Sequence, residues 1–109
     1  MIEDTLSQIQ QRIQSGHLRE EQKAELLRLV ERLQAEISTL STEDADQARS
    51  IAGYTGISAH EASRESRNPE LLEHSLQGLA NSVRGIEQSH PRLVEVVNNI
   101  CVTLSNLGI

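Results

Sequence analysis

Residues 50–64 read SIAGYTGISAHEASR, and their conformation decides how the middle of the chain folds. Gly53 and Gly56 would each cost about 1 kcal/mol relative to alanine inside a helix, so a break between them is one interpretation. A continuous or slightly bent helix is the other, because small residues recur at helical spacing across both glycines: Ala45, Ala48, Ala52, Gly56 and Ala59. Such a stripe lets two helix backbones approach closely, and the dispersion attraction between them offsets the cost of the glycines. We favour a helix whose surface is built for close contact.

The same stretch contains HEASR at residues 60–64, close to the H-E-x-x-H motif of zinc proteases. That motif needs a second histidine as metal ligand. Arg64 stands there instead, and an arginine repels a zinc ion. We therefore expect no metal site, and we expect Glu61 to lie near Arg64 on a polar helix face.

Apolar residues recur at spacings of three and four along the whole chain, which predicts helices throughout. The expected helices span about 2–15, 18–40, 42–66, 69–88 and 91–107. The first apolar stripe begins at Ile2. Gly16 stands where a left-handed C-terminal cap is expected, and Gly108 ends the last helix. Asn68 and Pro69 form a typical helix start, as does Pro91.

Two apolar stripes and the small-residue stripe are predicted to form helix seams. In residues 18–40 the strict alternation resembles a coiled-coil seam, made of Leu26, Val30, Leu33, Ile37 and Leu40. The close approach is assigned to Ala48, Ala52, Gly56 and Ala59. The C-terminal apolar face is Leu93, Val97, Ile100, Leu104 and Leu107. Leu27 and Leu29 lie beside the first seam and indicate more than one neighbouring helix.

These patterns predict a single all-α domain of elongated helical hairpins with coiled-coil-like packing. Residues 18–40 and 42–66 are expected to form one antiparallel hairpin, and the last two helices a second. In so elongated a chain the apolar stripes would be half covered, leaving about 10 kcal/mol of burial unsatisfied. A homo-oligomer, as a twofold dimer or larger, is the simplest way to cover them.

The composition excludes several classes of protein. The net charge is −6, with no basic cluster and one aromatic residue, Tyr54, so we expect no nucleic-acid binding. No apolar run is long enough to span a membrane, and the N-terminal MIEDTLSQ is unlike a signal peptide. A lone cysteine, Cys101, fits a reducing compartment and is expected to be buried and inert. The expected location is the cytoplasm, with no membrane partner.

No other pattern indicates catalysis. Ser89 and His90 are adjacent, but a serine nucleophile needs a base that a third group orients, and Pro91 indicates a helix start. We therefore expect no enzyme, no catalytic residues and no cofactor.

The segment 68–109 has an amphipathic helix, the junction Glu87-Gln88-Ser89-His90-Pro91 and the closing LSNLGI of residues 104–109. These features resemble a family of small bacterial helical proteins that is classed only as a domain of unknown function. The resemblance is specific from Asn68 onward. It implies a helical bacterial protein and no known activity, and leaves the role of the Ser89-His90-Pro91 junction open.

Together these observations predict a non-enzymatic helical module that assembles with itself, in a cellular role that the sequence does not reveal. The alternative is a small adaptor or regulator that binds a different protein through its C-terminal amphipathic helix.

Overall fold

The computed structural model describes residues 2–107, with side chains from Asp4 onward. Its elements are α1 (Ile2–Ser15), α2 (Glu20–Ile37), the 3₁₀ turn η1 (Thr42–Asp44), α3 (Ala45–Ser63), α4 (Pro69–Ser82) and α5 (Pro91–Leu107). The prediction of an all-α fold is confirmed. The predicted helix end at Gly108 and the predicted place of the Ile2 side chain lie outside the described residues.

The glycines of the opening stretch lie inside a helix. α3 runs unbroken through Gly53 and Gly56, so the interpretation as a continuous helix is confirmed. A Cβ built at Gly56 would lie 3.6 Å from Cδ1 of Ile9 in α1. Ala48, Ala52 and Ala59 are buried on the same side of α3. The small-residue stripe therefore makes its close approach to α1 of the same chain.

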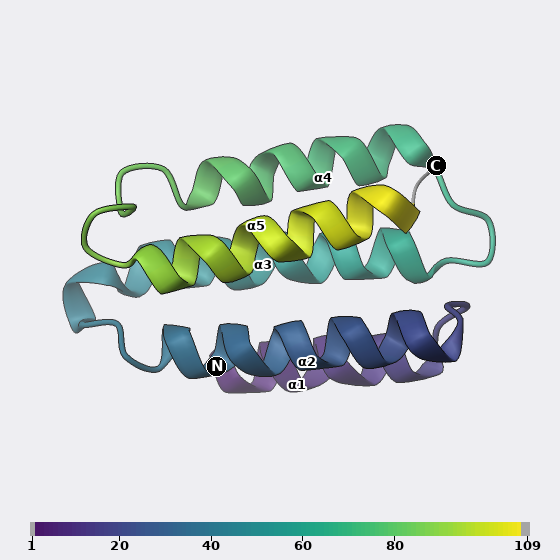
Figure 1. The fold of residues 1–109 in the computed structure, drawn as a ribbon, viewed down its shortest axis with the longest axis horizontal. Coiled ribbons are helices and arrows are strands. Elements are labelled where there is room, and N and C mark those ends of the chain that lie inside the picture. Colours follow the sequence, from purple (N-terminus) through teal and green to yellow (C-terminus); the bar gives the residue numbers. More distant parts are fainter. Residues whose placement is uncertain (1, 108–109) are drawn as a thin grey trace.

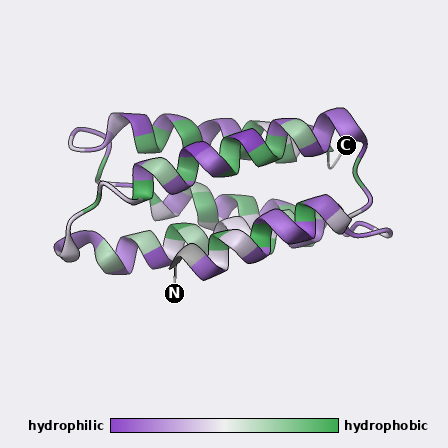
Figure 2. Ribbon diagram, turned by 90° about the horizontal axis from the view of Figure 1, so that it is seen from below, coloured by the Kyte–Doolittle hydropathy of each residue, from purple (hydrophilic) through white to green (hydrophobic). Residues whose placement is uncertain are grey.

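The five α-helices of residues 2–107 close into a ring. Around it, α1 packs on α2, α2 on α5, α5 on α4, α4 on α3, and α3 on α1 (Figure 1). The predicted hairpin of α2 with α3 is wrong, because α2 packs between α1 and α5 and barely touches α3. The second predicted hairpin, α4 with α5, is present. Each helix alternates hydrophobic and hydrophilic residues along its length (Figure 2), as a helix with one buried side requires.

This ring buries the apolar stripes within one chain. The residues of the two predicted seams and of the C-terminal face are all buried except Leu40 and Gly56, which are half-buried. The Cα radius of gyration is 12.9 Å, close to the roughly 13 Å of an ordinary compact domain of this length. The expected elongated chain with half-covered stripes is therefore wrong, since α5 covers the side of α2 that was expected to need a second copy.

Three predicted helix ends are too late, for local reasons. α2 ends at Ile37, where the hydroxyls of Ser38 and Thr39 bond back to carbonyls of the last turn and compete with further helix. α3 ends at Ser63, and the Arg67 side chain caps its terminal carbonyls by donating to Ala62 O. α4 ends at Ser82, shortly before Gly85, whose φ of +91° is left-handed.

Gly16 does not have the left-handed conformation predicted for it, since Gly85 is the glycine with positive φ among the described residues. Gly16 serves close packing instead. A Cβ at this position would lie 2.6 Å from Cβ of Ser63, so the turn between α1 and α2 rests directly on the end of α3.

The predicted start of α4 is confirmed: Asn68 Oδ1 accepts hydrogen bonds from the amides of Glu70 and Leu71, and Pro69 follows it.

None of the helices between residues 2 and 107 combines the length and the hydropathy that a membrane span requires.

Gly53→Ala is expected to raise the free energy of unfolding by about 1 kcal/mol, because alanine favours the helix and a Cβ at Gly53 meets no atom within 4 Å. Gly78→Ala is the control: its Cβ would overlap the Tyr54 ring, so the gain in propensity is lost to displacement of that ring. Urea unfolding followed by far-UV circular dichroism measures both changes. Equal gains would mean that Tyr54 does not pack on Gly78.

Candidate functional site

The residues of the HEASR motif form a structural ion pair. Oε1 of Glu61 accepts a hydrogen bond of 2.9 Å from Nη1 of Arg64, as the sequence predicts. The predicted polar helix face is wrong for Glu61, because its side chain is buried. His60 is exposed on the outer side of α3. Across the part of the chain that the structure describes, three or more His, Cys, Asp or Glu side chains nowhere gather as a metal site would require.

The Ser89-His90-Pro91 junction joins two connections of the bundle. Nε2 of His90 lies 3.4 Å from Oδ2 of Asp44, and Ser41 Oγ donates to the same carboxylate oxygen over 3.2 Å. Ser89 Oγ instead donates to the carbonyl of Ile86. A Ser-His-Asp relay needs the histidine between the other two groups, whereas here the carboxylate lies in the middle. The arrangement ties the start of α5 to the start of α3.

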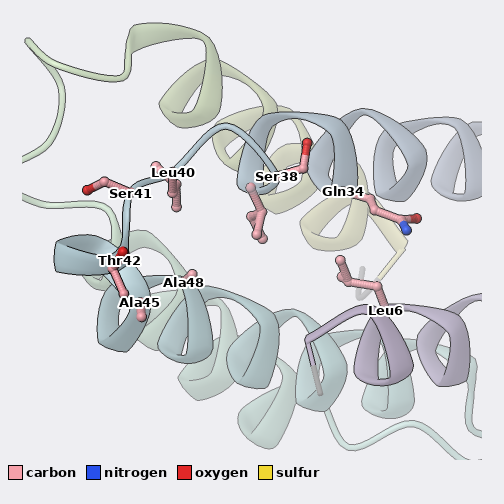
Figure 3. Close-up of a pocket in the computed structure, with 9 residues that line it drawn as sticks. Leu6, Gln34, Ser38, Leu40, Ser41, Thr42, Ala45 and Ala48 are labelled. Atoms are coloured by element: carbon pink, nitrogen blue, oxygen red, sulfur yellow. The ribbon is translucent and has the colours of Figure 1, made fainter.

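A pocket of about 390 Å³ opens between the start of α1, the end of α2 and the start of α3 (Figure 3). Leu6 and Gln34 lie on opposite helices beside it, and Ala45 and Ala48 of α3 close another side. No charged side chain of the described residues lines it. Its serine hydroxyls are already engaged, Ser38 with a backbone carbonyl and Ser41 with Asp44. The pocket as described therefore has no activated nucleophile and no base.

A second hollow, of about 480 Å³, lies along α4 and α5. Leu76 and Ala80 of α4 and Cys101 and Val102 of α5 contribute its apolar lining, with Glu73 at its edge. Val102 is 59% exposed, the largest value among the exposed large hydrophobic residues that the structure describes. The hollow therefore leaves an apolar depression open on the bundle's outer side.

The Cys101 thiol forms part of this hollow and is only half-buried. Burial raises its pKa above the ordinary value, which keeps it protonated and slow to react near neutral pH. The sequence prediction of full burial is wrong in degree, because Cys101 lies beside the stripe that enters the core. Its Sγ lies 3.9 Å from the carbonyl oxygen of Leu76.

The hollow lies in a group of three helix segments that contain no charged residue, although Glu73, just before the second of them, also lines it. Residues 50–59 of α3, residues 74–83 of α4 and the turn after it, and residues 96–107 of α5 contain no Asp, Glu, Lys or Arg, although 24% of the chain is charged. These three helices are neighbours in the ring (Figure 1). The exposed members of the segments, called here the uncharged face, are Ser50, Gly53, Tyr54, Ile57, His74, Gln77, Ala80, Asn81, Asn98, Asn99, Val102, Ser105 and Asn106.

The uncharged face is held together by polar contacts between its helices. Ser58 Oγ donates to Ser75 Oγ over 3.1 Å in the buried seam of α3 with α4, and Ser75 donates in turn to the carbonyl of Leu72. Gln47 of α3 donates to carbonyls near the end of α4. Arg67 bonds to the carbonyls of Ala62 and Leu107. The three helices therefore form a fixed platform.

A comparison with models of protein families shows which family the chain belongs to. The model of a family described as a domain of unknown function, DUF4404, matches residues 26–109. The chain belongs to the DUF4404 family. The resemblance to a family of unknown function is thus confirmed, while its bacterial scope and its SHP and LSNLGI signature stay predictions. Searches of curated proteins and of solved structures find no match.

The DUF4404 match begins inside α2 and includes all three helices of the uncharged face, whereas α1 precedes it. Sequence reasoning named none of the exposed apolar residues of this face as site residues, because it followed buried stripes at helical spacing. The signal was the absence of charges in three separate segments. The absence of charges indicates one shared surface only once the fold places the three segments side by side.

Proposed function

We propose that this chain is a non-enzymatic helical module that associates with a second copy of itself through the uncharged face. The observation that carries the proposal is the exposure of Val102, Ile57 and Tyr54 on three neighbouring helix segments that contain no charged residue. The cores of protein interfaces are depleted of charge and enriched in apolar and aromatic side chains. A solvated helix surface in a chain of this composition would normally carry several charges.

The position of the charges favours a second copy as the partner. Between the first and second uncharged segments, residues 61–73 contain four glutamates and two arginines; between the second and third, residues 84–95 contain two of each. These two groups lie at opposite ends of the bundle. A twofold axis that lies in the plane of the interface and crosses the helices would place the acidic end of one copy beside the neutral end of the other. That pairing avoids direct repulsion between like ends.

The buried seams that sequence analysis assigned to oligomerisation do not enter this proposal, because they are used inside the chain. The seam of Leu26, Val30 and Leu33 contributes to the core, and so does the C-terminal stripe of Leu93, Val97 and Ile100. Association instead uses the outer sides of α3, α4 and α5.

Several further expectations belong to the same proposal. The net charge of −6 disfavours a nucleic-acid partner. The lone, half-buried cysteine fits a reducing compartment such as the cytoplasm. An adaptor that binds a different protein is the second candidate, favoured by the open hollow between α4 and α5, which suits a row of apolar side chains from a partner helix.

Val102→Asp is expected to weaken self-association by more than about a hundredfold, because it places an unpaired charge in the centre of the interface. Size-exclusion chromatography with light scattering, over a wide range of concentration, measures the mass against the 12.1 kDa of one chain. Ala35→Asp on the exposed side of α2 is the matched control, since it adds the same charge outside the face and leaves the mass unchanged. Reaction of Cys101 with a thiol reagent should slow as the unmodified chain associates.

A mass of 12.1 kDa for the unmodified chain at every concentration contradicts self-association and leaves the adaptor as the function to test. A dimer that both aspartate variants leave intact means that the chain associates through a different surface.

A further inference from the structure

Two charges of opposite sign bracket the uncharged segment of α4. Glu73 stands immediately before residues 74–83, and Arg84 stands immediately after them. Both residues are exposed, and within the part of the chain that the structure describes neither side chain forms a hydrogen bond or an ion pair. The two charges are therefore available to a partner at the edges of the uncharged face.

These two charges lie in one row along the outer side of α4. The members of the row are exposed and follow one another at steps of four, three and four residues, which places them on one helix face: Glu73, Gln77, Ala80 and Arg84. Although α4 ends at Ser82, the turn continues to Arg84, whose amide donates to the carbonyl of Asn81. The left-handed backbone of Gly85 then turns the chain away, so the row ends at Arg84.

The row is symmetric about the middle of α4. Its outer pair and its inner pair of residues share one midpoint, between Gly78 and Leu79. A second α4 that runs antiparallel across this point places Glu73 of each copy beside Arg84 of the other. The two resulting contacts lie about 16 Å apart, since each residue of a helix advances 1.5 Å.

The neighbouring helix α3 has its centre at the same level. Tyr54 lies at the middle of the uncharged residues 50–59. Its ring packs on Gly78 of α4, because a Cβ built at Gly78 would overlap the ring. A twofold axis through the midpoint of α4 therefore also passes the middle of the uncharged segment of α3. Both helices then contribute uncharged residues near the axis and charges at the edge, which is the usual anatomy of a protein interface.

We infer that Glu73 of each copy pairs with Arg84 of the other across this axis, and that the two symmetric ion pairs determine the orientation of the dimer. The inference rests on the self-association proposed above and adds what fixes its geometry. A parallel arrangement of the two α4 helices brings Glu73 against Glu73 and Arg84 against Arg84, so like charges repel at both ends. Charges at the edge of an interface act on specificity and on the rate of association. The pairs therefore favour a second copy of this chain over other apolar surfaces.

Charge reversal on the full chain tests the pairing. Glu73→Arg and Arg84→Glu each give like charges at both contacts, so each variant alone should dimerise at least about tenfold more weakly than the unmodified chain. An equal mixture of the two variants should recover a dimer with one copy of each, because every contact then again joins opposite charges. The chain that carries both changes should dimerise with itself as the unmodified chain does. Light scattering gives the mass against the 12.1 kDa of one chain, and native mass spectrometry identifies the mixed dimer.

Glu31→Arg on the exposed side of α2 is the control, since it reverses the same charge outside the uncharged face and should leave dimerisation unchanged. Dimers that persist in both single variants overturn the ion pairs and leave self-association in place. A mixture that stays monomeric at concentrations where the unmodified chain dimerises also overturns them, because the two charges then do not face each other. An unmodified chain of 12.1 kDa at every concentration contradicts both the ion pairs and self-association.

Discussion

A chain with aspartate in place of Val30 is expected to unfold. Val30 is 1% exposed in the middle of α2, and the helices on either side of it, α1 and α5, bring apolar side chains to that core. A carboxylate placed there must either remain charged without a partner or take up a proton at a cost in free energy. We expect a loss of about 4–5 kcal/mol or more, most of the roughly 5–15 kcal/mol that stabilises a domain.

Far-UV circular dichroism and urea unfolding measure this loss. Ala35→Asp, five residues further along the same helix and exposed, should leave the unfolding midpoint nearly unchanged. The experiment also distinguishes two roles of the apolar stripe of α2: packing inside the chain, and contact with a second copy. A folded Val30→Asp chain with an unchanged midpoint and a reduced mass would show that the stripe contacts another copy, as the sequence alone predicts.

The helices themselves could be predicted because their signals are local. Apolar spacing of three and four places each helix, and Asn68 with Pro69 marks the start of α4 to the residue. The helix ends were harder, because they depend on bonds that spacing does not show. The hydroxyls of Ser38 and Thr39 turn back on the last carbonyls of α2, and the left-handed backbone at Gly85 follows the end of α4.

The arrangement of the helices could not be read from the stripes, because the stripes are chemically alike. Leu26, Val30 and Leu33 pack equally well against any aliphatic helix, and nothing local says that α5 is the one beside them. Leu27 and Leu29 carried the useful signal. They widen the apolar side of α2, and in the structure Leu29 is buried while Leu27 lines a depression beside α1. A wide apolar stripe indicates that a helix packs against two neighbouring helices. The five helices of residues 2–107 each have such neighbours because they close into a ring.

The candidate interface was hidden for a related reason. Its three uncharged segments are visible in the sequence, but each one alone is an ordinary stretch of a helix. They form one surface only because α4 lies between α3 and α5. The small residues of α3, by contrast, could be interpreted from the sequence. Their spacing indicated a close approach to another helix, and in the structure Gly56 lies against Ile9 of α1.

Two isoleucines of α3 provide the second large prediction, because they separate the core from the uncharged face. Ile51 is 0% exposed and Ile57 is 51% exposed. The step of six residues from one to the other turns the helix by about 240°, so one points into the bundle and the other toward solvent. Ile51→Ala is expected to cost about 2–5 kcal/mol, the range for a buried aliphatic side chain whose site cannot collapse fully. Ile57→Ala should cost about 0.5 kcal/mol or less.

The comparison is well controlled, since both substitutions remove the same atoms from the same helix and gain the same helix propensity. Urea unfolding at a concentration where the chain is monomeric gives the two stabilities. Light scattering at high concentration should show the reverse order: Ile57→Ala weakens self-association, whereas the folded fraction of Ile51→Ala associates as the unmodified chain does. Similar losses of stability at the two positions would mean that the outer side of α3 is packed against something within the chain. The uncharged face would then be part of the core and unable to bind a partner.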